Sequence, residues 1–166
     1  ALGGLELPAG MQFTSDMKKA GERQDAIVLA TASVYTRGVA RELRPYVKTG
    51  QLLVCVAKGI EEKSLLFQTD EVQEEIPDAV VACLSGPSHA EEVARRLPTT
   101  CVAGAADSAV AEQVQELFMN RVFRVYTSTD VKGIELGGAV KNVIALAAGI
   151  ADGLGYGDNT KAALIT

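Results

Sequence analysis

Leu52-Leu53-Val54-Cys55-Val56-Ala57-Lys58-Gly59 is the stretch that decides the fold class of this chain. Six apolar or small residues end abruptly at a lysine and a glycine, a pattern typical of a parallel strand that is covered on both faces. Similar apolar runs lie on either side, at residues 26–30 and 80–84. Three such runs predict one wound sheet with buried strands.

The segments between these runs have helical spacing. We expect helices at about 34–46, 65–75 and 109–119, a short helix around 91–93, and further strands at 99–103 and 122–126. Strand and helix therefore alternate from about residue 25 to residue 126. This order predicts parallel β-α units in a wound, mostly parallel, Rossmann-like α/β sheet with helices on both faces.

The pattern changes at Ser128-Thr129-Asp130. Asp130 suits the N-cap of a helix that continues to about residue 151 with apolar residues on nearly every side, as expected for a helix buried between layers or domains. Another helix is expected from Asn159. We therefore predict two parts, a partial dinucleotide-binding domain over 1–128 and the start of an all-α substrate domain over 129–166.

Composition excludes several classes of protein. The net charge is −5 and no run of Lys or Arg follows a phosphate backbone, so no nucleic-acid partner is expected. The one histidine has no ligand cluster around it, so no metal site is expected. Three separated cysteines indicate buried free thiols in a reducing, cytoplasmic compartment. The most apolar stretch, residues 139–150, is interrupted by Lys141-Asn142, and we expect no membrane span.

Polar residues follow the predicted strands at their carboxyl ends, where open α/β sheets bind ligands. The Lys58 ammonium suits an anionic substrate or a cofactor phosphate, and the alternative is an ordinary solvated lysine. Gly86 offers a bare backbone and Ser88 a hydroxyl near a helix start, which suit a hydroxyl or an anion, unless the segment is a plain turn. His89 is expected to be exposed or at the edge of the core.

Lys141 and Asn142 interrupt the apolar helix beside two glycines. A buried lysine charge without a partner is costly, so Lys141 must pair, reach solvent or line a polar site. Partial desolvation or a neighbouring cation would lower the pKa of Lys141 toward the range of a useful base for a substrate hydroxyl. The alternative is a structural salt bridge with Glu135 or Asp152.

The glycines at 153, 155 and 157 superficially suggest a nucleotide loop. They lack the spacing G-x-G-x-x-G, and they follow a predicted helix where a nucleotide loop would follow a strand. We therefore expect a turn between helices.

Long motifs in one register along the whole chain closely resemble bacterial NAD(P)-dependent glycerol-3-phosphate dehydrogenase. They include Ala57-Lys58-Gly59-Ile60-Glu61, the runs 84–94 (LSGPSHAEEVA) and 123–128 (FRVYTS), the run 133–145 (GIELGGAVKNVIA), and the run 149–163 (GIADGLGYGDNTKAA). The resemblance implies an oxidoreductase that interconverts sn-glycerol 3-phosphate and dihydroxyacetone phosphate by hydride transfer with NAD or NADP, feeding glycerophospholipid synthesis.

The resemblance also implies roles for individual residues. Lys141 is the expected proton acceptor in the oxidation direction and also contacts substrate. Lys58 is expected to contact substrate and cofactor, and Ala90 to line the nicotinamide side. The expected substrate contacts are completed by Gly86, Ser88 and Asn142. Ser33 is the expected cofactor contact in Thr31-Ala32-Ser33-Val34, which stands where the family commonly has Val-Pro-Ser-Gln.

By comparison with the family, we expect the glycine-rich phosphate loop before residue 1. We expect the Arg-Asn motif that holds cofactor and substrate phosphate beyond Thr166. The sheet is then truncated, and we expect the isolated chain to be inactive. A homodimer of the full-length protein is left open. Two alternatives remain: a related 3-hydroxyacid or 6-phosphogluconate-type dehydrogenase, which also carries a lysine on a long interdomain helix, and a non-catalytic nucleotide-binding fragment.

Overall fold

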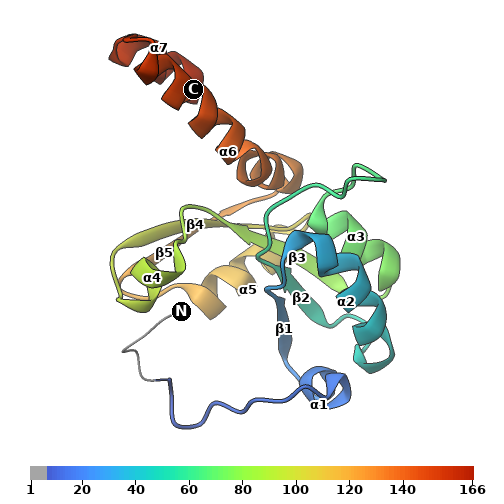
Figure 1. The fold of residues 1–166 in the computed structure, drawn as a ribbon. Helices are drawn as coiled ribbons and strands as arrows, with labels where there is room; N and C mark the ends of the chain where they lie inside the picture. The colour runs from blue at the N-terminus through green and yellow to red at the C-terminus, as the bar shows by residue number, and fades with distance from the viewer. Residues whose placement is uncertain (1–6) are drawn as a thin grey trace.

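A five-stranded sheet with helices on both faces makes up most of the molecule (Figure 1). The computed structural model describes residues 7–166; residues 1–6 of the expected domain 1–128 lie outside the described residues. The strands are β1 (Ala26–Leu29), β2 (Leu52–Cys55), β3 (Val80–Ser85), β4 (Thr99–Gly104) and β5 (Phe123–Ser128). The helices are α1 (Met17–Gly21), η1 (Ser33–Tyr35), α2 (Thr36–Leu43), η2 (Arg44–Tyr46), α3 (Gln68–Glu75), α4 (Ala90–Ala94), α5 (Ser108–Phe118), α6 (Val131–Gly153) and α7 (Asp158–Ile165).

The strands lie side by side in chain order, and the first three run parallel. Leu29 is paired with Cys55, and Cys55 with Cys83, so these strands are in register near their carboxyl ends. The loops that leave β1, β2 and β3 therefore emerge along one edge of the sheet. The predicted mostly parallel α/β sheet is confirmed.

The direction of β4 corrects one expectation. We predicted a run of parallel β-α units from about residue 25 to residue 126 in a mostly parallel sheet, but within this run β4 is antiparallel to β3, and β5 is then parallel to β4. The reason lies in the connection between β3 and β4, which contains only the five-residue helix α4. A parallel neighbour needs a crossover that carries the chain back over the face of the sheet, and this short helix does not supply one.

The core has two halves, one on each face of the sheet. On β2, Leu52 and Val54 point to one face, where they pack with residues of α5, and Leu53 and Cys55 point to the other, with residues of α2 and α3. This alternation explains why the strand consists almost entirely of apolar residues. The edge where β2 ends is therefore held rigidly by packing on both sides.

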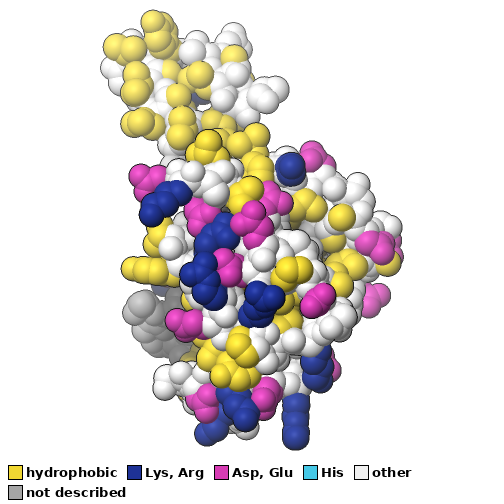
Figure 2. All heavy atoms as spheres, turned by 90° about the vertical axis from the view of Figure 1, so that its right-hand side faces the viewer, with side chains coloured by type: hydrophobic (Ala, Val, Ile, Leu, Met, Phe, Trp, Pro, Cys, Tyr) yellow, Lys and Arg dark blue, Asp and Glu magenta, His cyan; other side chains and the backbone are white. Residues whose placement is uncertain are grey.

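α6 begins where predicted, since the Asp130 carboxylate accepts a hydrogen bond from the Gly133 amide at 2.9 Å. The prediction that this helix is buried was wrong for most of its length. Its first half contacts β3 and β4, whereas the second half packs with α7 and extends away from the sheet (Figure 1). Apolar side chains gather there (Figure 2), and Val143 and Leu146 are each 66% exposed.

α6 is also long and apolar enough to cross a membrane, judged by length and composition alone, a test that core helices of soluble proteins pass as well. The expectation of no membrane span therefore stays a prediction.

Candidate active site

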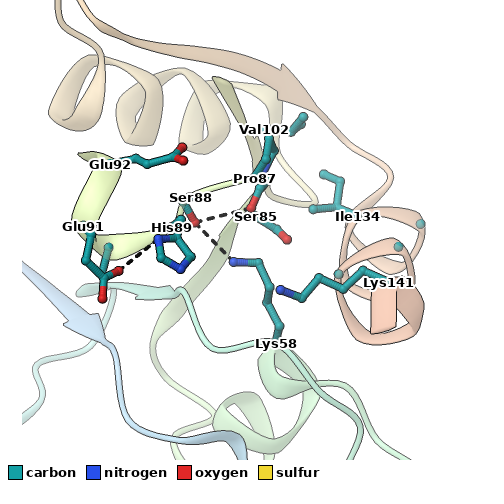
Figure 3. A pocket seen from close by; sticks show the side chains of 15 residues that line it. Lys58, Ser85, Pro87, Ser88, His89, Glu91, Glu92, Val102, Ile134 and Lys141 are labelled. Atoms are coloured by element: carbon teal, nitrogen blue, oxygen red, sulfur yellow. Dashed lines mark hydrogen bonds and ion pairs between the residues drawn. The ribbon is translucent and has the colours of Figure 1, made fainter. Parts of the chain in front are cut away.

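A cavity of about 840 Å³ lies between the loop after β2, the turn after β3 and the first half of α6 (Figure 3). It lies at the edge where the three parallel strands end. Side chains from both predicted parts of the chain line it, among them Lys58, Ser88 and Lys141. The topology thus gathers residues that lie far apart in the sequence.

Lys58 enters the cavity from the end of β2. The buried strand holds its backbone, and its half-buried side chain extends toward the turn after β3, where Nζ donates a hydrogen bond to Ser88 Oγ at 3.2 Å. Burial lowers the pKa of Lys58 below its usual range, and the nearby Lys141 ammonium lowers it further. Lys58 is therefore a cation whose charge and position suit an anionic ligand.

The turn after β3 needs glycine at Gly86. Its φ is +157°, and a Cβ built there would lie 2.6 Å from the carbonyl oxygen of Thr100 and 2.8 Å from Cys101 Cα. These are backbone atoms of β4, which cannot move aside like the end of a flexible side chain. The turn holds the Ser88 hydroxyl, which donates to the Gly86 carbonyl at 3.3 Å while it accepts from Lys58.

Lys141 reaches the cavity from α6. It shares one helix face with Ile134 and Gly138, at spacings of i, i+4 and i+7. A Cβ on Gly138 would lie 2.8 Å from Ser85 Oγ and 3.4 Å from Lys58 Cγ, so the helix backbone comes very close to the end of β3 and to the stem of Lys58. This close approach explains the glycine beside the lysine and directs Lys141 toward Lys58 (Figure 3).

The surroundings of Lys141 correct two expectations. Lys141 is exposed to the open cavity and is not buried. Neither predicted salt-bridge partner contacts it: Glu135 accepts hydrogen bonds from Thr69, and Asp152 pairs with Lys161 at 3.0 Å. Among residues 7–166, no carboxylate lies within 4.0 Å of its ammonium. The structural salt bridge proposed as the alternative is therefore not formed, and the amine is available to a ligand.

Of the predicted site residues, five line the cavity together: Lys58, Gly86, Ser88, Ala90 and Lys141. Asn142 does not line it, because one helical step turns its side chain about 100° away from that of Lys141. Ser33 does not line the cavity either; it lies next to the loop after β2, with its Oγ 2.8 Å from the place where a Cβ on Gly59 would stand. The roles of all seven stay predictions.

Sequence reasoning missed acidic residues at the start of α4. Glu91 and Glu92 line the cavity, and His89 Nδ1 lies 2.9 Å from Glu91 Oε2. Their signal was present, since acidic residues favour the first turn of a helix and this helix follows the Gly-Pro turn directly. As expected, the His89 side chain is exposed.

The site offers no metal-binding set within the described part of the chain, where no group of three or more His, Cys, Asp or Glu comes together. Its cavity is instead lined by small residues, including Gly86, Ala90, Gly137 and Gly138. Because these side chains are small, they leave the cavity open beside the two lysines.

Two family models match the chain. The model described as NAD-dependent glycerol-3-phosphate dehydrogenase N-terminus matches residues 1–111, and the corresponding C-terminus model matches residues 130–166.

Individual relatives agree with these models. The chain is 62% identical over 165 residues to a glycerol-3-phosphate dehydrogenase, NAD(P)+ type, of Agathobacter rectalis, covering 99% of this chain and 49% of the relative. A relative of the same name from Fusobacterium nucleatum is 53% identical, with 96% and 48% covered. A crystal structure of glycerol-3-phosphate dehydrogenase from Coxiella burnetii superimposes with a TM-score of 0.85 at 31% identity, over 98% of this chain and 50% of that one. The chain thus spans about half the length of the curated relatives it matches.

Proposed function

We propose that this chain, which belongs to the NAD-dependent glycerol-3-phosphate dehydrogenase family, carries catalytic residues of an enzyme. That enzyme interconverts sn-glycerol 3-phosphate and dihydroxyacetone phosphate with NAD or NADP. One observation carries the proposal: Lys58 and Lys141 enter the same cavity from the sheet edge and from α6. Two ammonium groups and a serine hydroxyl suit a small, phosphorylated, hydroxylated substrate.

In this proposal Lys58 and Ser88 hold the substrate. The hydrogen bond between them fixes both groups before the substrate arrives, so little conformational freedom is lost on binding. Gly86 keeps the turn close to β4 and leaves its carbonyl to orient the Ser88 hydroxyl.

Lys141 is the proposed base. In the oxidation direction, a neutral Lys141 amine accepts the proton of the substrate C2 hydroxyl while the C2 hydrogen leaves as hydride, so the C–H and O–H bonds break and a carbonyl forms. In the reverse direction, the Lys141 ammonium returns the proton to the carbonyl oxygen. The absence of a carboxylate partner for Lys141 within residues 7–166 supports this role.

The residues present fit the reacting end of a dinucleotide cofactor. The small side chain of Ala90 and the glycines of α6 leave space beside the lysines for a nicotinamide ring, which when bound supplies the hydride acceptor. No G-x-G-x-x-G sequence occurs in the 166 residues, and the glycines at 153, 155 and 157 stand at the end of α6 and in the turn to α7, where they make no strand-to-helix loop. We therefore assign only the nicotinamide side to these residues.

The division of the chain into a partial dinucleotide-binding domain, 1–128, and the start of a helical substrate domain, 129–166, belongs to the same proposal. It is supported by the change of architecture at Asp130, where the sheet ends and α6 begins. A cytoplasmic location is also proposed, supported by three buried free thiols.

A direct test compares substrates on the full-length protein that carries this chain. Oxidation of NADH or NADPH is followed with dihydroxyacetone phosphate and, separately, the reverse reaction with 3-hydroxy acids. We expect turnover with the phosphorylated ketone and none with the acids. Turnover of the acids alone would replace this function with that of a 3-hydroxyacid dehydrogenase, and turnover of neither would reject both.

A further inference from the structure

The start of α3 is capped by a residue from another helix. Phe67, at the N-cap position, makes no side-chain cap hydrogen bond. The Glu135 side chain of α6 takes that place: Oε1 accepts from the Thr69 amide at 3.1 Å, and Oε2 accepts from the Thr69 hydroxyl. Glu135 is only 6% exposed. A carboxylate at this point also faces the positive end of the α3 dipole, which stabilises the contact.

The contact can be satisfied in only one placement of α6. A buried carboxylate without hydrogen-bond donors is costly. Burial raises the pKa of Glu135, and the two hydrogen bonds from Thr69 work against that rise. A rotation or a slide of α6 would carry Glu135 away from Thr69 and leave both groups without a partner, so the contact selects one orientation of the helix.

The same helix carries Lys141 into the cavity. Lys141 lies six positions after Glu135, which is about 9 Å along a helix axis. Gly138 lies between them and packs against the stem of Lys58. Within the described residues, the hydrogen bonds from α6 to the strands or to the helices that cover them are all made by the Glu135 carboxylate, at the start of α3. Beyond Gly138 the helix leaves the sheet, so these hydrogen bonds and the glycine contact set the direction of Lys141.

We propose that Glu135, held by Thr69, is a positioning residue that aims Lys141 at Lys58 and at the bound substrate. The expected effect on catalysis rests on the proposed function, whereas the positioning of Lys141 by Glu135 does not depend on it. Glu135 does not line the cavity and acts only through the helix it anchors.

The test uses the full-length protein with two ways of breaking the contact. Glu135→Gln replaces the acceptor that faces the Thr69 hydroxyl with an amide, and Thr69→Val removes the hydroxyl at nearly constant shape. Thr69→Ser keeps the hydroxyl and serves as the conservative rescue. Glu112→Gln, an exposed carboxylate on α5, controls for the lost charge, and Val114→Ala, a fully buried side chain on α5, controls for lost stability alone.

Two readouts separate positioning from folding. The first is steady-state kinetics: kcat should fall about 10- to 100-fold in Glu135→Gln and Thr69→Val, as for a misplaced catalytic group, while KM for the cofactor changes less than about twofold. The second is independent of activity. The titration midpoint of Lys58, followed by NMR of isotopically methylated lysines, should rise in both variants toward the midpoint found in Lys141→Ala, because the Lys141 charge has moved away.

The controls Thr69→Ser, Glu112→Gln and Val114→Ala should keep the wild-type kcat and the wild-type midpoint of Lys58. Wild-type kcat and an unchanged Lys58 midpoint in both contact-breaking variants would overturn the proposal, as would an equal loss of kcat in Val114→Ala. If the wild type turns over no substrate at all, the proposed function fails, and the Lys58 midpoint still decides whether Glu135 positions Lys141. If Glu135→Gln does not fold, Thr69→Val against Thr69→Ser decides alone.

Discussion

Lys58 and Lys141 point their ammonium groups into one cavity, one from the end of β2 and the other from the middle of α6 (Figure 3). Their proximity has an electrostatic signature, since the Lys141 ammonium contributes to the lowered pKa of Lys58. Two like charges held this close repel each other unless an anion lies between them. The arrangement is therefore suited to an anionic ligand.

Replacing Lys141 by alanine should remove the chemistry and keep the fold. The side chain is exposed and makes no ion pair among residues 7–166, so its loss costs little stability. We expect kcat of the full-length protein to fall by about 10²- to 10⁴-fold, the usual contribution of a general base, with an unchanged circular dichroism spectrum. Lys132→Ala, an exposed lysine on the same helix outside the cavity, should keep the wild-type kcat. Undiminished turnover in Lys141→Ala would rule out its role as the base.

Substrate affinity should weaken at alkaline pH through Lys58. Because burial and Lys141 lower the pKa of Lys58, its positive charge is present below that lowered pKa and is lost as the pH rises through it. Lys141→Gln removes the neighbouring charge, so the pKa of Lys58 rises and the alkaline loss of affinity moves to higher pH. Calorimetric Kd values for the phosphorylated substrate between about pH 7 and about pH 11 measure this midpoint. An identical midpoint in wild type and variant would show that the two lysines do not interact.

Much of the sheet could be predicted because each buried strand carries its own local signal. The runs 26–30, 52–57 and 80–84 are apolar throughout, and a polar residue follows each of them. The direction of β4 could not be predicted in this way, since it depends on how far the connection after β3 travels. The residues of β4 do not indicate its direction, whereas the shortness of α4 does.

The site was predictable where one residue breaks an apolar pattern, as Lys58 and Lys141 do. It was not predictable where a contact joins distant parts of the chain. Glu135 stands in an apolar helix, but nothing near it in the sequence indicates that Thr69, on α3, is its partner. Helical spacing could have separated Asn142 from Lys141, because adjacent positions on a helix face different directions.

Two glycine substitutions should have opposite effects on stability. In Gly86→Ala, the new Cβ would meet the Thr100 carbonyl at 2.6 Å on a residue with φ of +157°, so we expect the free energy of unfolding to fall by about 1–3 kcal/mol. Gly149, inside α6, has no atom within 4 Å of an added Cβ, and Gly149→Ala should raise the free energy of unfolding by about 0.5–1 kcal/mol through helix propensity. Urea unfolding measures both, and a neutral Gly86→Ala would show that the turn after β3 relaxes freely.

Stability should also fall as the pH rises from about 4.5 to about 7, because of Glu71 on α3. This side chain is 1% exposed, accepts a hydrogen bond from Gln68 Nε2 at 2.8 Å, and has its pKa raised by burial, then by the charge of Glu61, from 4.5 to about 7. Since the folded state holds this proton more tightly than the unfolded state, the free energy of unfolding decreases from about pH 4.5 to about pH 7 and then levels off. Glu71→Gln cannot ionise, so at about pH 8 it should be more stable than the wild type by up to about 3 kcal/mol, with little difference at about pH 4. Urea unfolding across this pH range measures the effect. The control Glu112→Gln, which loses an exposed carboxylate of α5, should show the same pH dependence as the wild type. If the free energies of unfolding of wild type and Glu71→Gln change in parallel with pH, Glu71 is ionised without cost in the folded protein.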